Sequence, residues 1–185
     1  MKPLLILCAV PALCLAQSAQ DVLNRAEPLI TAERFAEAEQ ILSAAVQQES
    51  GNVELLYRLG YVQYRQRKLA PARESFARAV KLSPAAWYSM YFLGQISLLE
   101  NKPAEAINWL RPIVERGEPV FDAAARLAAA YTQTGQVDKA QQNLKIAIAQ
   151  APWDGSLYFR LGQLQKKQGQ PELAAASFAP GSSVT

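Results

Sequence analysis

Residues 121–154 read FDAAARLAAAYTQTGQVDKAQQNLKIAIAQAPWD, and this stretch decides the fold. Its apolar residues recur at spacings of three and four in two runs, which is the periodicity of helices and not of strands. The polar turn Thr134-Gly135-Gln136 separates the two runs, and Pro152 follows the second one, where a proline ends a helix. The stretch therefore predicts two antiparallel helices joined by a short turn.

The same pattern recurs along the chain. LLYRLGYVQY begins at Leu55, SMYFLGQISL at Ser89, AAARLAAAYT at Ala123 and LYFRLGQLQK at Leu157, so successive starts differ by 34 residues. One more step back reaches a fifth unit at Ala19. Self-similarity at a fixed period of this length indicates a repeat architecture. We predict about five 34-residue units over residues 17–178, starting near residues 19, 53, 87, 121 and 155, and a disordered tail over 179–185.

Large and small residues occupy fixed positions of the unit. Position 7 is leucine in the four later units and position 24 is leucine or phenylalanine, whereas position 8 is glycine or alanine and position 20 is always alanine. Small residues let the two helices of a hairpin approach closely, and the large ones fill the space beside them. Pro103 and Pro171 fall at the start of second helices, where a missing N–H costs little. Pro28 and Pro112 fall inside helices, which we expect to be kinked or shortened.

This pattern resembles the tetratricopeptide repeat. The resemblance rests on Leu-Gly or Leu-Ala at positions 7 and 8, alanine at 20 and the large residue at 24, with Tyr131 at 11, Gly135 at 15, and Pro84 and Pro152 at 32. It implies an all-α fold, a right-handed superhelical array of antiparallel helix hairpins, or α-solenoid, whose first helices line the concave face. The sequence departs from the pattern at Arg25-Ala26 in the first unit and at Glu118 in the third.

The resemblance also implies a binding surface, because positions 2, 5, 9, 12 and 13 point into the groove in that family. Five of the seven tyrosines fall in this set, all in two adjacent units. The predicted peptide-binding groove comprises Tyr57, Tyr61, Tyr64, Arg65, Tyr88, Tyr91, Gln95, Phe159, Gln163 and Lys166. Tyrosine offers apolar area and a hydroxyl with little rotamer entropy to lose, which suits a binding surface. The alternative is that these rings pack between neighbouring first helices.

Two further patterns bear on the ligand. The lysine and asparagine set with which some relatives clamp a peptide's terminal carboxylate is absent, since Tyr57 and Tyr61 stand where that set would begin. The unit from Ala19 carries two basic and six acidic residues, and the unit from Val53 carries seven basic and two acidic residues. Either these faces complement each other between neighbouring units, or Arg65 contributes to a positive patch beside the tyrosines.

Composition argues against catalysis and against several ligand classes. The chain has no histidine, which removes the commonest general base and the commonest metal ligand. The groove-facing acids Glu54 and Asp122 lie two units apart, about 20 Å, whereas catalytic carboxylate pairs lie within about 10 Å. A formal charge of +3 is too weak to indicate nucleic acid. We predict no catalytic residue, no cofactor and no metal site.

The first residues, MKPLLILCAVPALCLAQ, predict a signal peptide over residues 1–16. Lys2 precedes an apolar run that is too short to span a bilayer, which needs about 20 residues, and the run ends at the small-residue junction Ala16-Gln17. Cys8 and Cys14 both follow a leucine, whereas a lipid-anchored signal needs a small residue there, so we predict no lipid anchor and no membrane span after cleavage. Cleavage leaves no cysteine for a disulfide or a zinc site. The protein is expected to be exported, and to be periplasmic or secreted.

These observations together predict a non-catalytic scaffold or adaptor that works outside the cytoplasm. Its ligand would be a protein or peptide segment lying in the concave groove, with tyrosines as anchors. Because exposed tyrosines also stack on sugar rings, a glycan or cell-wall binding module that uses the same groove is the alternative.

Overall fold

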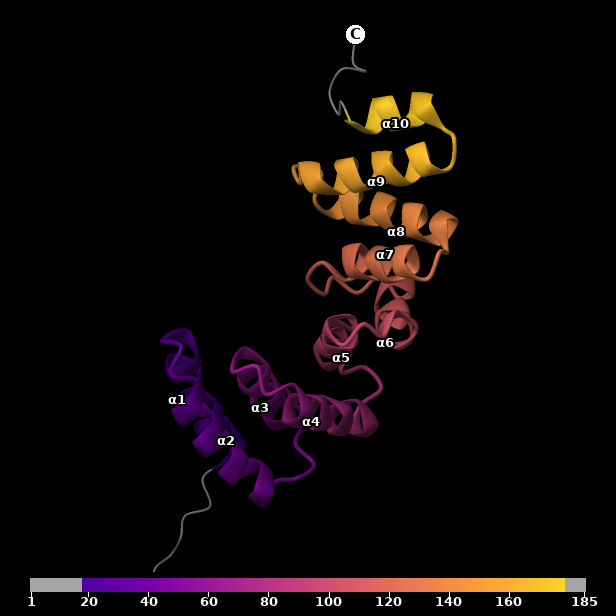
Figure 1. Cartoon of the computed structure of the whole chain (residues 1–185). Coiled ribbons are helices and arrows are strands. Elements are labelled where there is room, and N and C mark those ends of the chain that lie inside the picture. The colour runs from indigo at the N-terminus through magenta and orange to yellow at the C-terminus, as the bar shows by residue number, and fades with distance from the viewer. Residues whose placement is uncertain (1–17, 179–185) are drawn as a thin grey trace, which may run out of the picture.

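The computed structural model describes residues 18–178, and all the regular structure in this range is helical. In chain order the helices are α1 (Ala19–Thr31), α2 (Phe35–Gln48), α3 (Val53–Arg65), α4 (Leu69–Leu82), α5 (Trp87–Leu99), α6 (Pro103–Glu115), α7 (Ala123–Gln133), α8 (Val137–Gln150), α9 (Gly155–Lys167) and α10 (Pro171–Phe178). Consecutive pairs form hairpins that stack in chain order into an elongated, curved array (Figure 1). This confirms the predicted α-solenoid. The predicted signal peptide and the predicted tail both lie outside the described residues.

The two helices of each hairpin pack against each other through the small and large residues of the repeat. The five position-20 alanines are buried, and Ala38, Ala72, Ala106 and Ala140 have no exposed surface at all. A Cβ placed on Gly94 would lie 2.5 Å from Cγ of Leu110, which is far inside van der Waals contact. Glycine at position 8 therefore allows the close approach of the two helices, with the position-24 side chain packed directly against its backbone.

The turn inside each hairpin passes through a left-handed residue at position 15. These residues are Glu33 (φ 56°), Arg67 (62°), Asn101 (56°), Gly135 (73°) and Gly169 (72°). At the end of α3 the N–H of Lys68 donates to the carbonyl of Gln63, and the N–H of Arg67 donates to that of Tyr64, both at 2.9 Å. This is the Schellman pattern, which satisfies carbonyl groups that the helix end leaves unpaired.

The two prolines inside helices differ in their effect on helix length. α1 runs through Pro28 to Thr31 and has 13 residues, as α3 does, so this helix is not shortened. Pro28 is exposed and lies in the last turn, so its missing N–H and its ring affect only the end of the helix. α6 contains Pro112 and has 13 residues, one fewer than the 14 of α2, α4 and α8.

The connection after α6 is the irregular part of the array. It spans residues 116–122, whereas the other connections between hairpins span 49–52, 83–86 and 151–154. Gly117, with φ 70°, ends α6, and α7 then begins at Ala123, two residues later than the repeat predicts. Phe121 consequently lies outside the helix with φ 45°, a strained conformation for a bulky residue.

Buried apolar side chains form two clusters. One joins α1, α2 and α3, with Ala79 of α4, and the other runs from Ala72 of α4 to Leu164 of α9. Tyr61 contacts both clusters, so α3 lies where they meet. Within residues 18–178, none of the helices combines the length and the apolar character needed to cross a membrane.

Candidate functional site

The first helices of successive hairpins lie along one side of the array. α1 contacts α3, α3 contacts α5 and α5 contacts α7, whereas neither α7 and α9 nor any two successive second helices make comparable contacts in the part of the chain that the structure describes. In a curved stack the elements on the inner side approach each other most closely. The first helices therefore form the concave face, as the resemblance implies.

Three of the predicted tyrosines surround Phe92 at the junction of α3 and α5. The ring centroids of Tyr57, Tyr61 and Tyr64 lie 6.3, 5.6 and 5.1 Å from that of Phe92. Phe76 of α4 stacks on the same ring at 5.2 Å. All three tyrosines are half-buried, and burial raises the pKa of Tyr57 to about 12. These rings pack between neighbouring first helices and also leave part of their surface on the concave face.

The tyrosines of α5 differ from each other in exposure. Tyr91 is 6% exposed, and its hydroxyl donates to Asp122 at 2.5 Å and accepts from Gln95 at 2.6 Å. Burial, together with the hydrogen bond to Asp122, raises the pKa of Tyr91. Tyr88 is 49% exposed, and its ring lies 5.7 Å from that of Tyr57. Tyr88 therefore offers the most surface of the five predicted tyrosines, whereas Tyr91 and Gln95 serve the fold.

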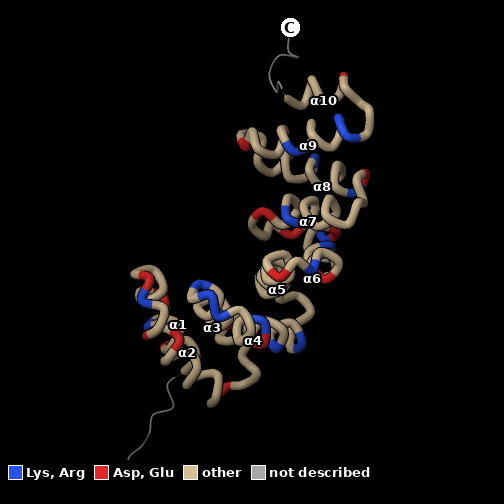
Figure 2. Tube along the Cα trace, in the orientation of Figure 1, with Lys and Arg blue, Asp and Glu red and all other residues tan. Residues whose placement is uncertain are grey.

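Arg65 is engaged between the first two hairpins. It pairs with Glu33 at 2.8 Å, donates to the hydroxyl of Tyr61 at 2.7 Å and lies over the ring of Phe35. Lys68 pairs with Glu39 across the same junction at 2.5 Å. Figure 2 shows basic residues at the end of α3 and acidic residues at the neighbouring end of the first hairpin, where Glu33 lies in the turn after α1. The charged faces of the first two units therefore complement each other.

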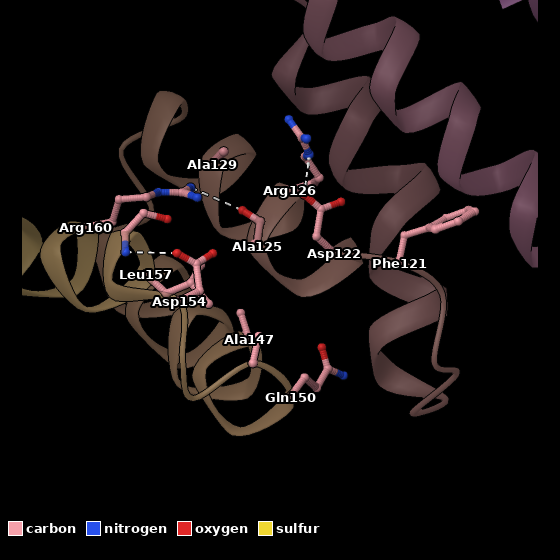
Figure 3. Close-up of a pocket in the computed structure, with 12 residues that line it drawn as sticks. Phe121, Asp122, Ala125, Arg126, Ala129, Ala147, Gln150, Asp154, Leu157 and Arg160 are labelled. Carbon is pink, nitrogen blue, oxygen red and sulfur yellow. Dashed lines mark hydrogen bonds and ion pairs between the residues drawn. The ribbon is translucent and has the colours of Figure 1, made fainter. Parts of the chain in front are cut away.

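Phe121 connects the aromatic surface to a cleft. Its ring is 58% exposed and lies 5.4 Å from Tyr88 and 4.9 Å from Tyr91. It also lines a cleft of about 390 Å³ between α7 and α9, with Arg160 on the opposite side (Figure 3). The repeat pattern predicted Phe121 to be the first residue of a helix and missed this role. The sequence signal for the departure is Glu118, which replaces the usual proline before an irregular connection.

The cleft exists because α7 carries small residues on its concave side. Ala125 and Ala129 occupy positions 5 and 9, where α3 has Tyr57 and Tyr61. A second hollow of about 240 Å³ continues along the same two helices. Its polar lining residues are Thr132, Gln133, Arg160, Gln163 and Lys167. Of the predicted site residues, Gln163 lies in this hollow and Lys166 lines neither hollow. Phe159 is 55% exposed and packs 5.7 Å from Phe178.

Charges in the cleft are unevenly paired. Arg126 pairs with Asp122 at 2.8 Å, and Asp154 accepts a hydrogen bond from the N–H of Ser156 at 2.9 Å. Arg160 donates to the carbonyl oxygen of Ala125 at 3.2 Å (Figure 3). Burial, and secondarily the charge of Arg126, lowers the pKa of Arg160. Sequence reasoning also missed Arg160, because position 6 is not among the groove positions of the resemblance.

The acidic residues of the concave face are occupied by neighbouring side chains. Glu54 pairs with Arg58 at 2.7 Å, and Asp122 accepts from both Tyr91 and Arg126. Over residues 18–178 no cluster of three potential metal-ligating side chains occurs. The concave surface therefore offers a ligand two hollows, exposed aromatic rings and the guanidinium of Arg160, whose hydrogen-bond partner is a backbone carbonyl.

Comparison with known proteins agrees with this architecture. One family model, described as tetratricopeptide repeat, matches residues 23–84 and 57–119, and a second with the same description matches 121–164. No curated protein matches the chain. The structure is similar to that of a MamA RS-1 double mutant, with a TM-score of 0.78 and 21% identity over 86% of this chain and 89% of that one.

Two other solved structures are similar to the same extent. MamA from Desulfovibrio magneticus RS-1 has a TM-score of 0.76 and 21% identity, over 86% of this chain and 90% of that one. YrrB, described as a tetratricopeptide repeat protein with an unusual peptide-binding site, has a TM-score of 0.75 and 19% identity, over 90% and 89%. Identities this low show the fold alone. The family models, however, cover most of the hairpins, and the chain therefore belongs to the tetratricopeptide repeat family of protein-interaction scaffolds.

Proposed function

We propose that the protein is a non-catalytic scaffold, exported from the cytoplasm, that binds a polypeptide segment along its concave face. The observation that carries this proposal is the continuity of surface through Phe121. The exposed rings of Tyr88 and Phe121 are 5.4 Å apart, and Phe121 lines the cleft between α7 and α9. Exposed aromatic anchors beside a polar hollow are a typical arrangement of protein-binding surfaces.

The proposed ligand lies across the first helices from α5 to α9. Tyr88 and Phe121 would contact its apolar side chains, and the small residues Ala125 and Ala129 leave room for its backbone in the cleft. Tyr57, Tyr61 and Tyr64 contribute the exposed parts of their rings. The peptide-binding site in the description of YrrB supports a polypeptide ligand, and the apolar leader of the sequence supports export.

The test is site-specific photocrosslinking in the cells that make the protein. A photoreactive residue at Tyr88 should give a discrete protein adduct, whereas one at Lys145, which is exposed on the second helix of the fourth hairpin, should not. Phe121→Ala should reduce the adduct formed from Tyr88. Equal adducts from both positions would contradict the proposal. Co-sedimentation with insoluble cell wall, without a protein adduct, would favour the glycan-binding alternative.

A further inference from the structure

The repeat places an arginine at position 6 in three hairpins. Arg58, Arg126 and Arg160 are separated by multiples of 34 residues and lie on α3, α7 and α9. Position 6 comes one turn after position 2, so a carboxylate at position 2 can pair with it along the helix. The three arginines are therefore equivalent in place, and their partners can be compared directly.

The first two arginines of this series are paired. Arg58 contacts Glu54, four residues earlier, at 2.7 Å, and Glu27 of the preceding hairpin at 3.0 Å. Arg126 contacts Asp122, also four residues earlier, at 2.8 Å. Arg58 thus shows the full set, which is one carboxylate from its own helix and one from the helix before.

Both carboxylates are missing around Arg160. Ser156 stands four residues earlier, in the place of Glu54, and Ala129 stands in the place of Glu27. In the range 18–178 no carboxylate lies within ion-pair distance of Arg160, whose one hydrogen bond goes to the carbonyl of Ala125. A guanidinium has five N–H donors, and a partly buried charge is stabilised by a partner.

Two acids, Asp122 and Asp154, line the cleft with Arg160, but both are engaged with other groups and neither makes an ion pair with it within residues 18–178. Asp154 caps α9 by accepting from the N–H of Ser156 at 2.9 Å. Asp122 already accepts from Tyr91 at 2.5 Å and from Arg126 at 2.8 Å. Arg160 lines both hollows of the cleft, so its unused donors are accessible to a ligand.

We propose that Arg160 binds an acidic side chain, Asp or Glu, of the polypeptide that the concave face takes up. The ligand's carboxylate stands where the carboxylates of Glu54 and Glu27 stand around Arg58. The inference rests on the proposed function and specifies the chemistry of its ligand. A planar guanidinium suits this partner because it can hold both carboxylate oxygens at once. Gln133 and Gln163, which line the adjoining hollow, add amide donors.

The net charge of the last hairpin favours the same ligand. From Gly155 to Phe178 the chain carries Arg160, Lys166 and Lys167 against the single acid Glu172. Lys167 lines the second hollow together with Arg160, and no acid lines that hollow. An acidic side chain that reaches Arg160 from the second hollow therefore meets a positive local field.

The test selects ligands for the purified protein from an unbiased library of random linear peptides and measures their affinities by calorimetry. Each selected peptide is compared with versions in which one acidic residue is replaced by its amide. We expect one acidic position at which the amide weakens binding at least about tenfold, since the loss of a partner of a desolvated charge has this effect or a larger one. This comparison needs no protein variant, so it does not depend on how a substitution affects folding.

Ser156→Glu is the matched protein variant. It supplies the carboxylate that Glu54 supplies to Arg58, and it should remove the preference for the acidic peptide while leaving the affinity for the amide version unchanged. Arg160→Gln should have the same effect. Arg58→Gln changes the equivalent position on α3, outside the cleft, and should keep the preference.

The possible outcomes separate the two proposals. If acidic and amide peptides bind equally, or if Ser156→Glu keeps the acidic preference, the role of Arg160 is refuted and the proposed function stands. If no peptide is enriched over an unrelated helical protein, the proposed function fails and the role of Arg160 fails with it.

Discussion

At the residue scale, the rings of the concave face contribute to packing and to exposed surface in different proportions. Tyr61 lies 6.5 Å from Tyr57 and 5.6 Å from Phe92, and its hydroxyl accepts from Arg65. Tyr88 contacts Tyr57 and Phe121 but is 49% exposed. The first ring holds α3 against α5, and about half of the second is exposed to a ligand.

This difference predicts opposite effects of two alanine substitutions. Tyr61→Ala should lower the free energy of unfolding by about 1–2 kcal/mol, below the range of a fully buried aromatic residue because the ring is half-buried. Tyr88→Ala should lower it by less than about 1 kcal/mol and should weaken ligand binding by about 2 kcal/mol, the scale of a hot-spot residue. Urea denaturation and peptide calorimetry on the two variants measure both quantities. A larger loss of stability in Tyr88→Ala would contradict this division.

The burial of Tyr57 predicts a response to alkaline pH. Its pKa is raised from 10.0 to about 12, first because of burial. Since the folded state favours the neutral phenol, its contribution to stability is fully present below pH 10 and is lost as the pH rises through about 12. The ultraviolet absorbance of the phenolate should show a late titration step that shrinks in Tyr57→Phe. If Tyr57→Phe instead reduced the step near pH 10 and left the late step unchanged, Tyr57 would ionise as an exposed tyrosine does.

The repeat pattern predicted where these residues lie on the hairpin, because position in a helix fixes the direction of each Cβ. It did not predict how far each is buried, since that depends on the residue the next hairpin presents. The buried ring of Phe92 covers Tyr61 and Tyr64, whereas the ring of Phe121 beside Tyr88 is itself exposed and leaves Tyr88 49% exposed. The role proposed for Arg160 depends in the same way on its neighbours, Ser156 and Ala129. The lack of a carboxylate at these two positions becomes apparent only when Arg160 is compared with the paired Arg58.

At the scale of the element, the hairpin turns are the places where a single substitution can most readily stabilise the protein. Position 15 has positive φ in all five described hairpins, yet Glu33, Arg67 and Asn101 are not glycine. A left-handed conformation costs a residue with a Cβ roughly 1–2 kcal/mol, and glycine avoids this cost. The same Schellman pattern forms in each turn, so the strain is local to one residue and is independent of the hairpin's packing.

Arg67→Gly should therefore stabilise the protein by about 0.5–1 kcal/mol, once the extra freedom of glycine in the unfolded chain is subtracted. Gly135→Ala, at the same position of the fourth hairpin, should destabilise it by a similar amount. Thermal melting of the two variants beside the parent protein measures both effects. A lower melting temperature for Arg67→Gly would show that the arginine side chain contributes more than its backbone strain costs.

Helix boundaries were predictable wherever the connection between hairpins is short. The first helices begin at Ala19, Val53, Trp87 and Gly155, as the repeat predicts. The late start of α7 was not predictable from the period, because it follows from the longer connection over residues 116–122. That connection places Phe121 beside Tyr88, so the irregular segment is also the one that joins the aromatic surface to the cleft.

At the scale of the whole molecule, export is a prediction that the described residues do not test. The apolar run that ends at Ala16-Gln17 predicts cleavage there. N-terminal sequencing of the protein recovered from outside the cytoplasm should begin at Gln17. A recovered protein that still begins at Met1 would contradict cleavage, and its absence from every compartment outside the cytoplasm would contradict export.

The order of the hairpins is also a property of the whole molecule. Arg65 of the second hairpin pairs with Glu33 of the first at 2.8 Å, and Arg58 pairs with Glu27 of the first at 3.0 Å. Arg73, farther along the second hairpin, pairs with Glu100 of the third at 2.8 Å. Each of these junctions thus has its own set of partners, although the helices that meet there share one pattern of packing.

The ion pairs at the first junction limit how the repeat array can be extended by gene duplication. An in-frame duplication of the second hairpin would give Arg65 of the new copy a neighbour with Arg67 in the place of Glu33, and would set Lys68 of that copy against Arg73. Like charges would then meet where opposite charges now pair, on surfaces whose apolar residues still fit. A tandem copy of this hairpin would therefore need compensating acidic substitutions before it could pack stably against its neighbour. This holds even though the period of the repeat would be unbroken.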